Sequence, residues 1–199
     1  SDGFTWENDW AVGTTYKTND MVKYGGRLYI CRIPHTSAAT LASGLEADLN
    51  LADSTLSKWD NVADGIDWKG TWTVSTRYKV NDVVKYGGIN YICNTYHTSA
   101  ASVSLGLEQN LGNWDVFNRG IEYRDVWTSL TRYRVNDVVK YGGTLYICTL
   151  LHTSTTDFGV DISNWSAFVE GLQFENTWDI ATSYQPGDIV RYGGNQYVA

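Results

Sequence analysis

The stretch Asn81-Asp-Val-Val-Lys-Tyr-Gly-Gly-Ile-Asn-Tyr-Ile-Cys93, followed by His97-Thr-Ser99, decides the fold because the chain repeats it. Further copies of the same pattern begin at Asn19, Asn136 and Gly187. Self-similarity at intervals of this size is the signature of tandem small units that support one another. The sequence therefore predicts a repeat protein.

The centre of each copy is a predicted β-hairpin. Two glycines stand between short runs of Val, Ile, Tyr and Lys, and glycine readily takes the positive φ that a type I′ turn requires. If Gly87-Gly88 is the whole loop, one strand face carries the expected core residues Val84, Tyr86, Ile89, Tyr91 and Cys93. A longer loop would change the register and exchange some of these positions.

An Asn-Asp or Gly-Asp pair precedes each hairpin. Asx side chains bond nearby backbone N–H groups in tight turns, so we interpret the four carboxylates as turn residues, with a catalytic role as the alternative. They are Asp20, Asp82, Asp137 and Asp188.

The repeats predict units at residues 1–64, 65–119 and 120–170, with a partial fourth unit at 171–199. All length variation falls in the loop after His-Thr-Ser, where insertions are tolerated. The first such loop, from Ala38 to Lys58, has room for a short helical turn, whereas the third, from Thr155 to Asn164, is expected to be too short. We predict an all-β protein of tandem small antiparallel β modules, each built around a Gly-Gly hairpin.

Charge and composition exclude several functions. The net charge is −7 and the pI is about 4.8, which disfavours nucleic acid and anionic membranes as partners. No apolar run approaches the roughly 20 residues of a membrane span, so no membrane insertion is expected. The nine Trp and 14 Tyr suit both small cores and wet binding faces.

One cysteine occurs at the same place in each of the first three repeats, at Cys31, Cys93 and Cys148. We interpret each as a buried thiol that packs as a small hydrophobe. The alternative, a metal site in Cys-x-x-x-His, offers two ligands per unit where structural zinc requires four. Neither a metal nor another cofactor is expected.

The order Trp72, Tyr78, Asn81-Asp82, Tyr86-x-Gly88, Tyr91 and Trp114 resembles the type 3 chitin-binding domain, that is, carbohydrate-binding modules of families 5 and 12. The Trp68-Lys-Gly-Thr-Trp72 opening and the His-Thr-Ser ending are similar to the variety found in tandem in bacteriophage tail and fibre proteins. The resemblance implies a compact three-stranded antiparallel module that binds insoluble polysaccharide through exposed aromatic rings. The second Trp site of the family is not matched, because the chain reads Cys93-Asn-Thr-Tyr-His97 there.

The resemblance marks the first Trp of each unit as a ligand contact, and hairpin-tip tyrosines and loop histidines are further candidates. For all of them, packing or fixing a loop is the alternative role. The candidate ligand-binding residues are Trp10, Trp72, Trp127, Trp178, Tyr24, Tyr86, Tyr141, Tyr192, His35, His97 and His152.

The first hypothesis is non-catalytic, multivalent binding of a polysaccharide or surface glycan, in adhesion at a virion surface or outside the cell. The second is a structural fibre segment whose repeats are spacers, and a homo-oligomer or fibre is left open. An enzyme is disfavoured because no nucleophile–base set stands out. Flat aromatic rings open to solvent at matching places would favour binding, and buried rings would favour a spacer.

Overall fold

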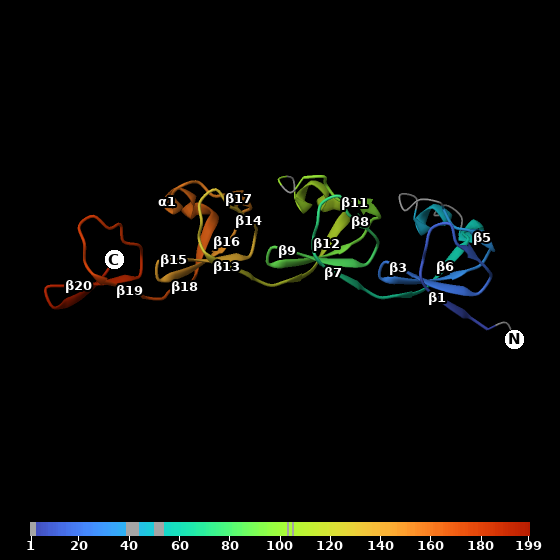
Figure 1. The fold of residues 1–199 in the computed structure, drawn as a ribbon, viewed down its shortest axis with the longest axis horizontal. Helices are drawn as coiled ribbons and strands as arrows, with labels where there is room; N and C mark the ends of the chain where they lie inside the picture. Colours follow the sequence, from blue (N-terminus) through green and yellow to red (C-terminus); the bar gives the residue numbers. More distant parts are fainter. Residues whose placement is uncertain (1–2, 39–43, 50–53, 103, 105) are drawn as a thin grey trace. The chain divides into compact units, whose positions relative to one another are not determined.

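The computed structural model describes residues 3–38, 44–49, 54–102, 104 and 106–199. Figure 1 shows small sheets that recur along the chain, with short helical turns beside the first three. The all-β prediction is confirmed. In the described part of the chain, no helix is long and apolar enough to cross a membrane.

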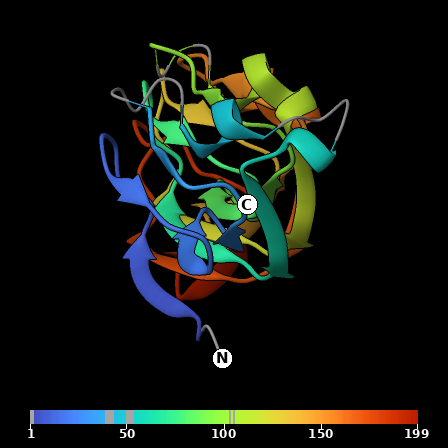
Figure 2. The same ribbon diagram turned by 90° about the vertical axis from the view of Figure 1, so that its right-hand side faces the viewer.

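The first repeat contains one four-stranded sheet in the order β1-β3-β4-β6. These strands are β1 (Thr5–Asp9), β3 (Asp20–Tyr24), β4 (Arg27–Cys31) and β6 (Trp59–Asp64). A small second sheet pairs β2 (Thr15–Tyr16) with β5 (His35–Thr36). Two 3₁₀ turns, η1 (Leu45–Asp48) and η2 (Ser54–Leu56), lie in the long loop, which confirms the expected helical turn there. In Figure 2, β1 in blue and β6 in teal form opposite edges of this sheet.

The second and third repeats have the same plan. The second repeat contains β7 (Asp67–Thr71), β8 (Arg77–Tyr78), β9 (Asp82–Tyr86), β10 (Ile89–Cys93), β11 (His97–Thr98), η3 (Leu107–Asn113) and β12 (Trp114–Arg119). The third contains β13 (Glu122–Val126), β14 (Arg132–Tyr133), β15 (Asp137–Tyr141), β16 (Thr144–Cys148), β17 (His152–Thr153), α1 (Phe158–Asp161), η4 (Ile162–Asn164) and β18 (Trp165–Val169). The loop that was expected to be too short therefore holds a helical turn, because Asp157 caps α1 by accepting a hydrogen bond from Gly159 N.

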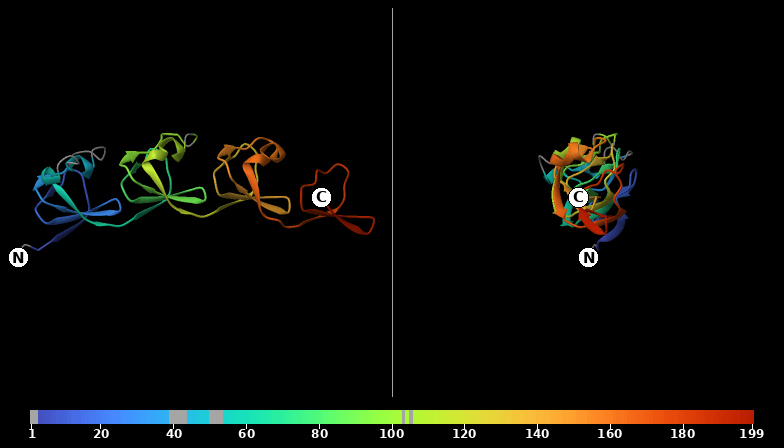
Figure 3. Two further views of the ribbon diagram at one scale, coloured as in Figure 1. Left: turned by 180° about the vertical axis from the view of Figure 1, so that it is seen from behind. Right: turned by 90° about the vertical axis from the view of Figure 1, so that its left-hand side faces the viewer.

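The fourth repeat, red in Figure 3, contributes β19 (Gln173–Thr177), β20 (Asp188–Tyr192) and β21 (Asn195–Val198). They form a three-stranded sheet in the order β19-β20-β21. No helical turn follows η4 among the described residues.

The first strand of each repeat pairs in parallel with the first hairpin strand, which the antiparallel prediction did not include. In repeat 1 the connecting segment is held by Tyr16, whose hydroxyl accepts a hydrogen bond from Ala11 N (2.9 Å). It is also held by Ser37, which donates to Ala11 O (2.7 Å). These bonds turn the chain so that β1 and β3 run in the same direction. Three antiparallel strands with one parallel edge replace the three-stranded module implied by the resemblance.

The two hairpin glycines have different physical roles. Tyr24 is opposite Arg27, so Gly25 and Gly26 are the whole loop, and Gly25 has φ of 65°. Gly26 is not among the positive-φ residues, although the sequence-based expectation of a type I′ turn required this at both positions. Its lack of a side chain matters for close packing instead, because a Cβ on Gly26 would lie 2.5 Å from Asn81 Cβ.

Aromatic rings dominate each core. In repeat 1, Trp59 meets Tyr16 edge to face at 5.0 Å, and Trp114–Tyr78 and Trp165–Tyr133 repeat this geometry at 5.0 Å each. Edge-to-face pairs stabilise by about 0.5–1.5 kcal/mol beyond the burial of their surface. Of the expected core face, Val84, Tyr86, Ile89 and Cys93 are buried and Tyr91 is half-buried.

The chain divides into two compact units. The first comprises residues 1–85 and 91–117, and the second comprises residues 86–90 and 118–199. This division differs from the repeat limits predicted at 64, 119 and 170, because the hairpin tip of repeat 2 packs with repeat 3. Each unit thus contains at least one packed junction between repeats.

Candidate functional site

Most of the Trp and Tyr side chains predicted as candidate ligand contacts are covered. Trp10 and Trp72 are only 6% and 5% exposed, and Tyr24 and Tyr86 are also buried. Trp10 and Tyr24 face each other edge to face at 5.4 Å, so the two candidates form one buried pair. The expectation that these four rings are open to a ligand is therefore corrected.

A side chain from the variable loop provides the cover. Leu45, at the start of η1, is fully buried in the same cluster as Trp10 and Tyr24. Gly44 precedes it with φ of 52°, and Tyr24 Oη donates to Glu46 Oε2 (2.6 Å), which ties the turn to the rings. We call Leu45 and its counterparts Leu107 and Phe158 the plug residues.

The third repeat shows the cover most clearly. Phe158 stacks on Tyr141 with ring centroids 4.1 Å apart and an 18° angle between the planes. It also meets Trp127 edge to face at 5.6 Å. Trp127 and Tyr141 are half-buried, and the plug covers one face of the Tyr141 ring.

In the fourth repeat the described residues hold no counterpart of a plug residue, and the aromatic pair is exposed. Trp178 and Tyr192 meet edge to face at 5.4 Å and are 40% and 59% exposed. With Val190 and Tyr197 they line an apolar hollow. Of the eight Trp and Tyr candidates, these two are the exposed ones.

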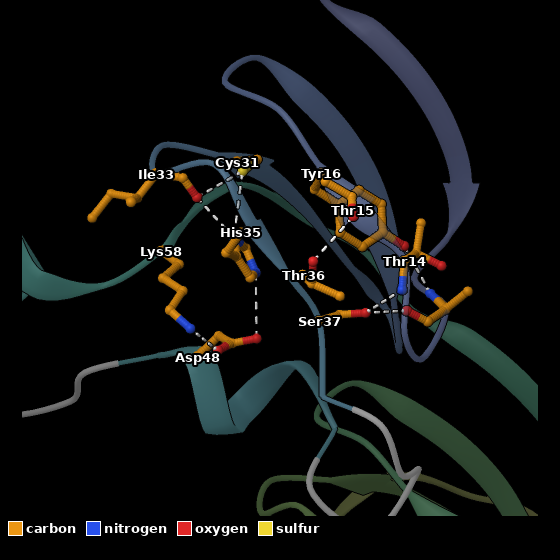
Figure 4. A network of polar contacts seen from close by, with 11 residues as sticks. Thr14, Thr15, Tyr16, Cys31, Ile33, His35, Thr36, Ser37, Asp48 and Lys58 are labelled. Atoms are coloured by element: carbon orange, nitrogen blue, oxygen red, sulfur yellow. Dashed lines mark hydrogen bonds and ion pairs between the residues drawn. The ribbon is translucent and has the colours of Figure 1, made fainter.

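The three histidines fix loops. In Figure 4, His35 Nδ1 lies 2.7 Å from Ile33 O and 3.8 Å from Cys31 Sγ, and His35 Nε2 lies 3.3 Å from Asp48. His97 and His152 make the same Nδ1 contacts, 2.7 Å to Thr95 O and 2.8 Å to Leu150 O. All three Nε2 atoms are buried, so no ring nitrogen faces a ligand, which corrects the binding role considered for them.

Burial also governs the titration of this network. Desolvation lowers the pKa of His97, which favours the neutral ring. Burial raises the pKa of Cys31 to about 11 and that of Cys93 and Cys148 to about 12. Each thiol donates to the same carbonyl that its histidine contacts. In the described part of the chain, no three His, Cys, Asp or Glu side chains are grouped to hold a metal ion.

The four carboxylates before the hairpins are turn residues. In each, Oδ2 accepts the backbone N–H three residues earlier, at 2.7 Å for Asp20, 2.9 Å for Asp82, 3.0 Å for Asp137 and 2.7 Å for Asp188. The residue before each carboxylate has a positive φ, between 66° and 87°. The turn interpretation is confirmed, and burial raises the pKa of Asp82 to about 6.

A second set of aromatic rings lies outside the residues predicted from the sequence. Each repeat exposes one ring at the second position of its parallel edge strand: Trp6 (52%), Trp68 (56%), Tyr123 (56%) and Phe174 (50%). We call these the edge-strand rings. The signal was the apolar i, i+2 spacing in Phe4-Thr-Trp6 and its counterparts, which was used only to infer a strand.

Each edge-strand ring begins an apolar row across its sheet. Trp6 is paired with Met21, which is opposite Ile30, and Tyr123 is paired with Val138, which is opposite Ile147. Cross-strand partners lie on the same face of a sheet. Alternation places these rows on the sheet face opposite Val22 and Val139, which belong to the core clusters, and Val138 in the third row is itself only 2% exposed.

An ion-paired carboxylate precedes the edge-strand ring of repeat 2 in the sequence. Asp67 accepts from Lys23 Nζ (2.9 Å) and from Lys69 Nζ (2.7 Å), and it directly precedes Trp68. Burial alone would raise the pKa of Asp67, but hydrogen bonds from Lys69 and Lys23 hold it below its ordinary value. Because side chains alternate faces along a strand, this ion pair and the Trp68 ring project from opposite faces of β7.

A family model matches two segments of the chain, and its description is carbohydrate-binding module family 5/12. The matched residues are 9–41 and 71–103, which lie at corresponding places in repeats 1 and 2. Comparison with curated proteins gives no match. Two corresponding segments of the chain are thus similar to carbohydrate-binding module family 5/12.

Proposed function

We propose that the chain binds polysaccharide without catalysis, weakly at each repeat and multivalently along the chain, through the edge-strand rings. The observation that carries this proposal is one half-exposed ring at the same strand position in all four repeats. The family match supports carbohydrate as the ligand class. The covered Trp–Tyr pairs of repeats 1 to 3 are assigned to packing.

The chemistry of the rings suits a sugar. The C–H face of a pyranose is apolar and stacks on a flat ring, while its hydroxyl groups need polar partners. A single ring gives weak binding, and four copies on one chain raise the avidity through effective concentration. We further propose that this binding serves adhesion at a virion surface or outside the cell.

A second candidate, a structural segment that assembles, has its own supporting observation. Val62 and Phe168 lie at bulges in the last strands of their sheets and are 51% and 46% exposed. Ile66, between β6 and β7, is also exposed. Repeated exposed apolar side chains are typical of interaction surfaces.

A glycan array followed by a polysaccharide pull-down tests the proposal. The ring variant replaces Trp6, Trp68, Tyr123 and Phe174 by Ala, and a matched bulge variant replaces Val62, Phe117 and Phe168 by Ser. All seven side chains are exposed, so both variants should keep the wild-type circular dichroism. We expect the ring variant to lose retention and the bulge variant to keep it. Equal retention by wild type and ring variant would refute the assignment, and loss of self-association by the bulge variant alone would favour the structural segment.

A further inference from the structure

Every edge strand shifts its register directly after its exposed ring. In repeat 1, Trp6 pairs with Met21 and Asp9 pairs with Lys23, so two residues of β1 lie opposite one residue of β3. The other three repeats shift by the same one residue at the same place, after Trp68, Tyr123 and Phe174. A bulge of this kind bends an edge strand and re-aims the side chains beside it, and bulges occur often next to functional sites.

The second residue after each ring has a left-handed backbone. Its φ is 66° at Asn8, 76° at Gly70, 67° at Asp125 and 70° at Asn176. Glycine reaches this conformation freely, and Asn and Asp are the most tolerant of the other residues. Gly70 shows that the bulge forms without a side chain, so three repeats carry a polar side chain that the backbone does not require.

These three polar side chains are open to a ligand. Asn8, Asp125 and Asn176 are exposed. An Asn or Asp with positive φ commonly bonds the nearby backbone. In the described part of the chain, however, no hydrogen bond or ion pair holds any of the three side chains. Asp125 lies between two other repeats and is as open as its counterparts, so the exposure is a property of the repeat.

The ring and the polar side chain lie close together on one strand. Two residues of a strand span at most about 6.8 Å, so one sugar unit can contact both groups. Asn and Asp share a side-chain oxygen that accepts hydrogen bonds, and the ligand group that fits it is a donor, such as a sugar hydroxyl. The carboxylate of Asp125 and the net charge of −7 both disfavour a sugar that is itself an anion.

We propose that the second residue after each edge-strand ring determines specificity, and that its oxygen accepts a hydrogen bond from a hydroxyl of a neutral polysaccharide stacked on the ring. This inference rests on the function proposed for the rings. Repeat 2 is the exception, because Trp68 provides a ring and Gly70 provides no polar contact. Repeat 2 can therefore be improved by a single substitution.

The variant Gly70→Asn tests the assignment as a gain of binding. The φ of 76° is one that Asn tolerates, and no described atom lies within 4 Å of a Cβ at this position, so the variant should keep the wild-type circular dichroism. Gly13→Asn, in the connection between β1 and β2, is the matched control, with φ of 61° and an equally open Cβ position. One added hydrogen bond should lower the Kd for colloidal chitin or cellulose about two- to tenfold in Gly70→Asn, and Gly13→Asn should leave the Kd unchanged.

A triple variant tests the same contact as a loss of binding. Asn8→Gly, Asp125→Gly and Asn176→Gly together remove the side chains and keep a residue that readily takes positive φ. Ser75→Gly, at an exposed position with φ of 51°, is the control. We expect the triple variant to raise the Kd about tenfold or more on whichever of the two neutral polysaccharides retains the wild type, and polygalacturonate, an anionic probe, to retain neither chain.

The variant in which the four edge-strand rings are replaced by Ala separates this inference from the proposed function. If that ring variant loses binding, wild-type Kd values for the triple variant or for Gly70→Asn would overturn the inference alone. Stronger retention on polygalacturonate than on the neutral polysaccharides would also overturn it. Wild-type binding by the ring variant, or retention of the wild type on none of the three probes, would instead overturn the proposed function and this inference with it.

Discussion

Removal of the Phe158 side chain is the sharpest test of how the variable loop stabilises a repeat. Phe158 is 3% exposed and contacts Tyr141, Tyr146, Trp127 and Trp165. Truncation of a buried Phe to Ala costs about 3–5 kcal/mol, through lost transfer energy and the cavity left behind. We expect Phe158→Ala to lower the free energy of unfolding of repeat 3 by this amount.

Two further variants make the magnitude informative. Phe158→Leu installs the side chain that repeats 1 and 2 use as Leu45 and Leu107, so it should cost less than about 1.5 kcal/mol. Val160→Ala changes a side chain that is 67% exposed and should stay within about 0.5 kcal/mol of wild type.

Hydrogen exchange is the suitable assay, because the chain has several cores and a single global transition cannot be assumed. Protection of amides in β15 and β16 reports repeat 3 directly. A loss below about 1 kcal/mol in Phe158→Ala would refute the conclusion that the loop side chain is part of the core.

Three further predictions concern buried groups and the repeat junctions. Burial raises the pKa of Asp82 to about 6 and so favours its protonated form, which stabilises the fold below the unfolded pKa of about 3.9. This stability is lost as the pH rises to about 6, so Asp82→Asn should flatten the fall in the free energy of unfolding between pH 4 and 6. An unchanged slope would contradict this prediction. In a urea titration, Gly88→Ala should destabilise the junction with repeat 3 by about 1–3 kcal/mol, because the added Cβ would lie 2.5 Å from Asn136 Cβ. Gly112→Ala is the control, since its Cβ would meet no described atom within 4 Å. With pKa values of about 11 to 12 and buried sulfur atoms, the three thiols should resist maleimide at pH 8 in the folded chain and all react after unfolding; rapid labelling of the native chain would show that they are exposed.

The sequence was informative wherever a local rule decides the structure. Alternating Val and Tyr around Gly-Gly predicted the hairpin strands, and the Asx signal predicted the turns that Asp82 and its counterparts make. Both depend on residues close in sequence, so no knowledge of the tertiary packing was needed.

Features that depend on long-range packing were missed. The plug residues come from the loop of variable length, and only the fold shows that Leu45 covers Trp10. A repeated Gly-Leu-Glu at Gly44 and Gly106 was a usable signal, since both glycines have positive φ before a 3₁₀ turn. The resemblance assigned ligand contact to the first Trp of each unit, and the plug reverses that assignment in repeats 1 and 2.

The parallel edge strand was missed for a similar reason. The segment that leads to its partner strand is held at Ala11 by Tyr16, which accepts from Ala11 N, and by Ser37, which donates to Ala11 O from 26 residues further along the chain. Without that strand in place, Trp6 could not be assigned to the outer face of the sheet.

A stepwise count of edge-strand rings tests the central claim most directly. On a polysaccharide that retains the wild type, chains with four, three, two and one of these rings would be compared by dissociation rate. We predict that each removal speeds dissociation, with a total loss of avidity of about 10²–10⁴ between four rings and one. Dissociation that is unchanged as Trp6, Trp68, Tyr123 and Phe174 are removed in turn would contradict the account.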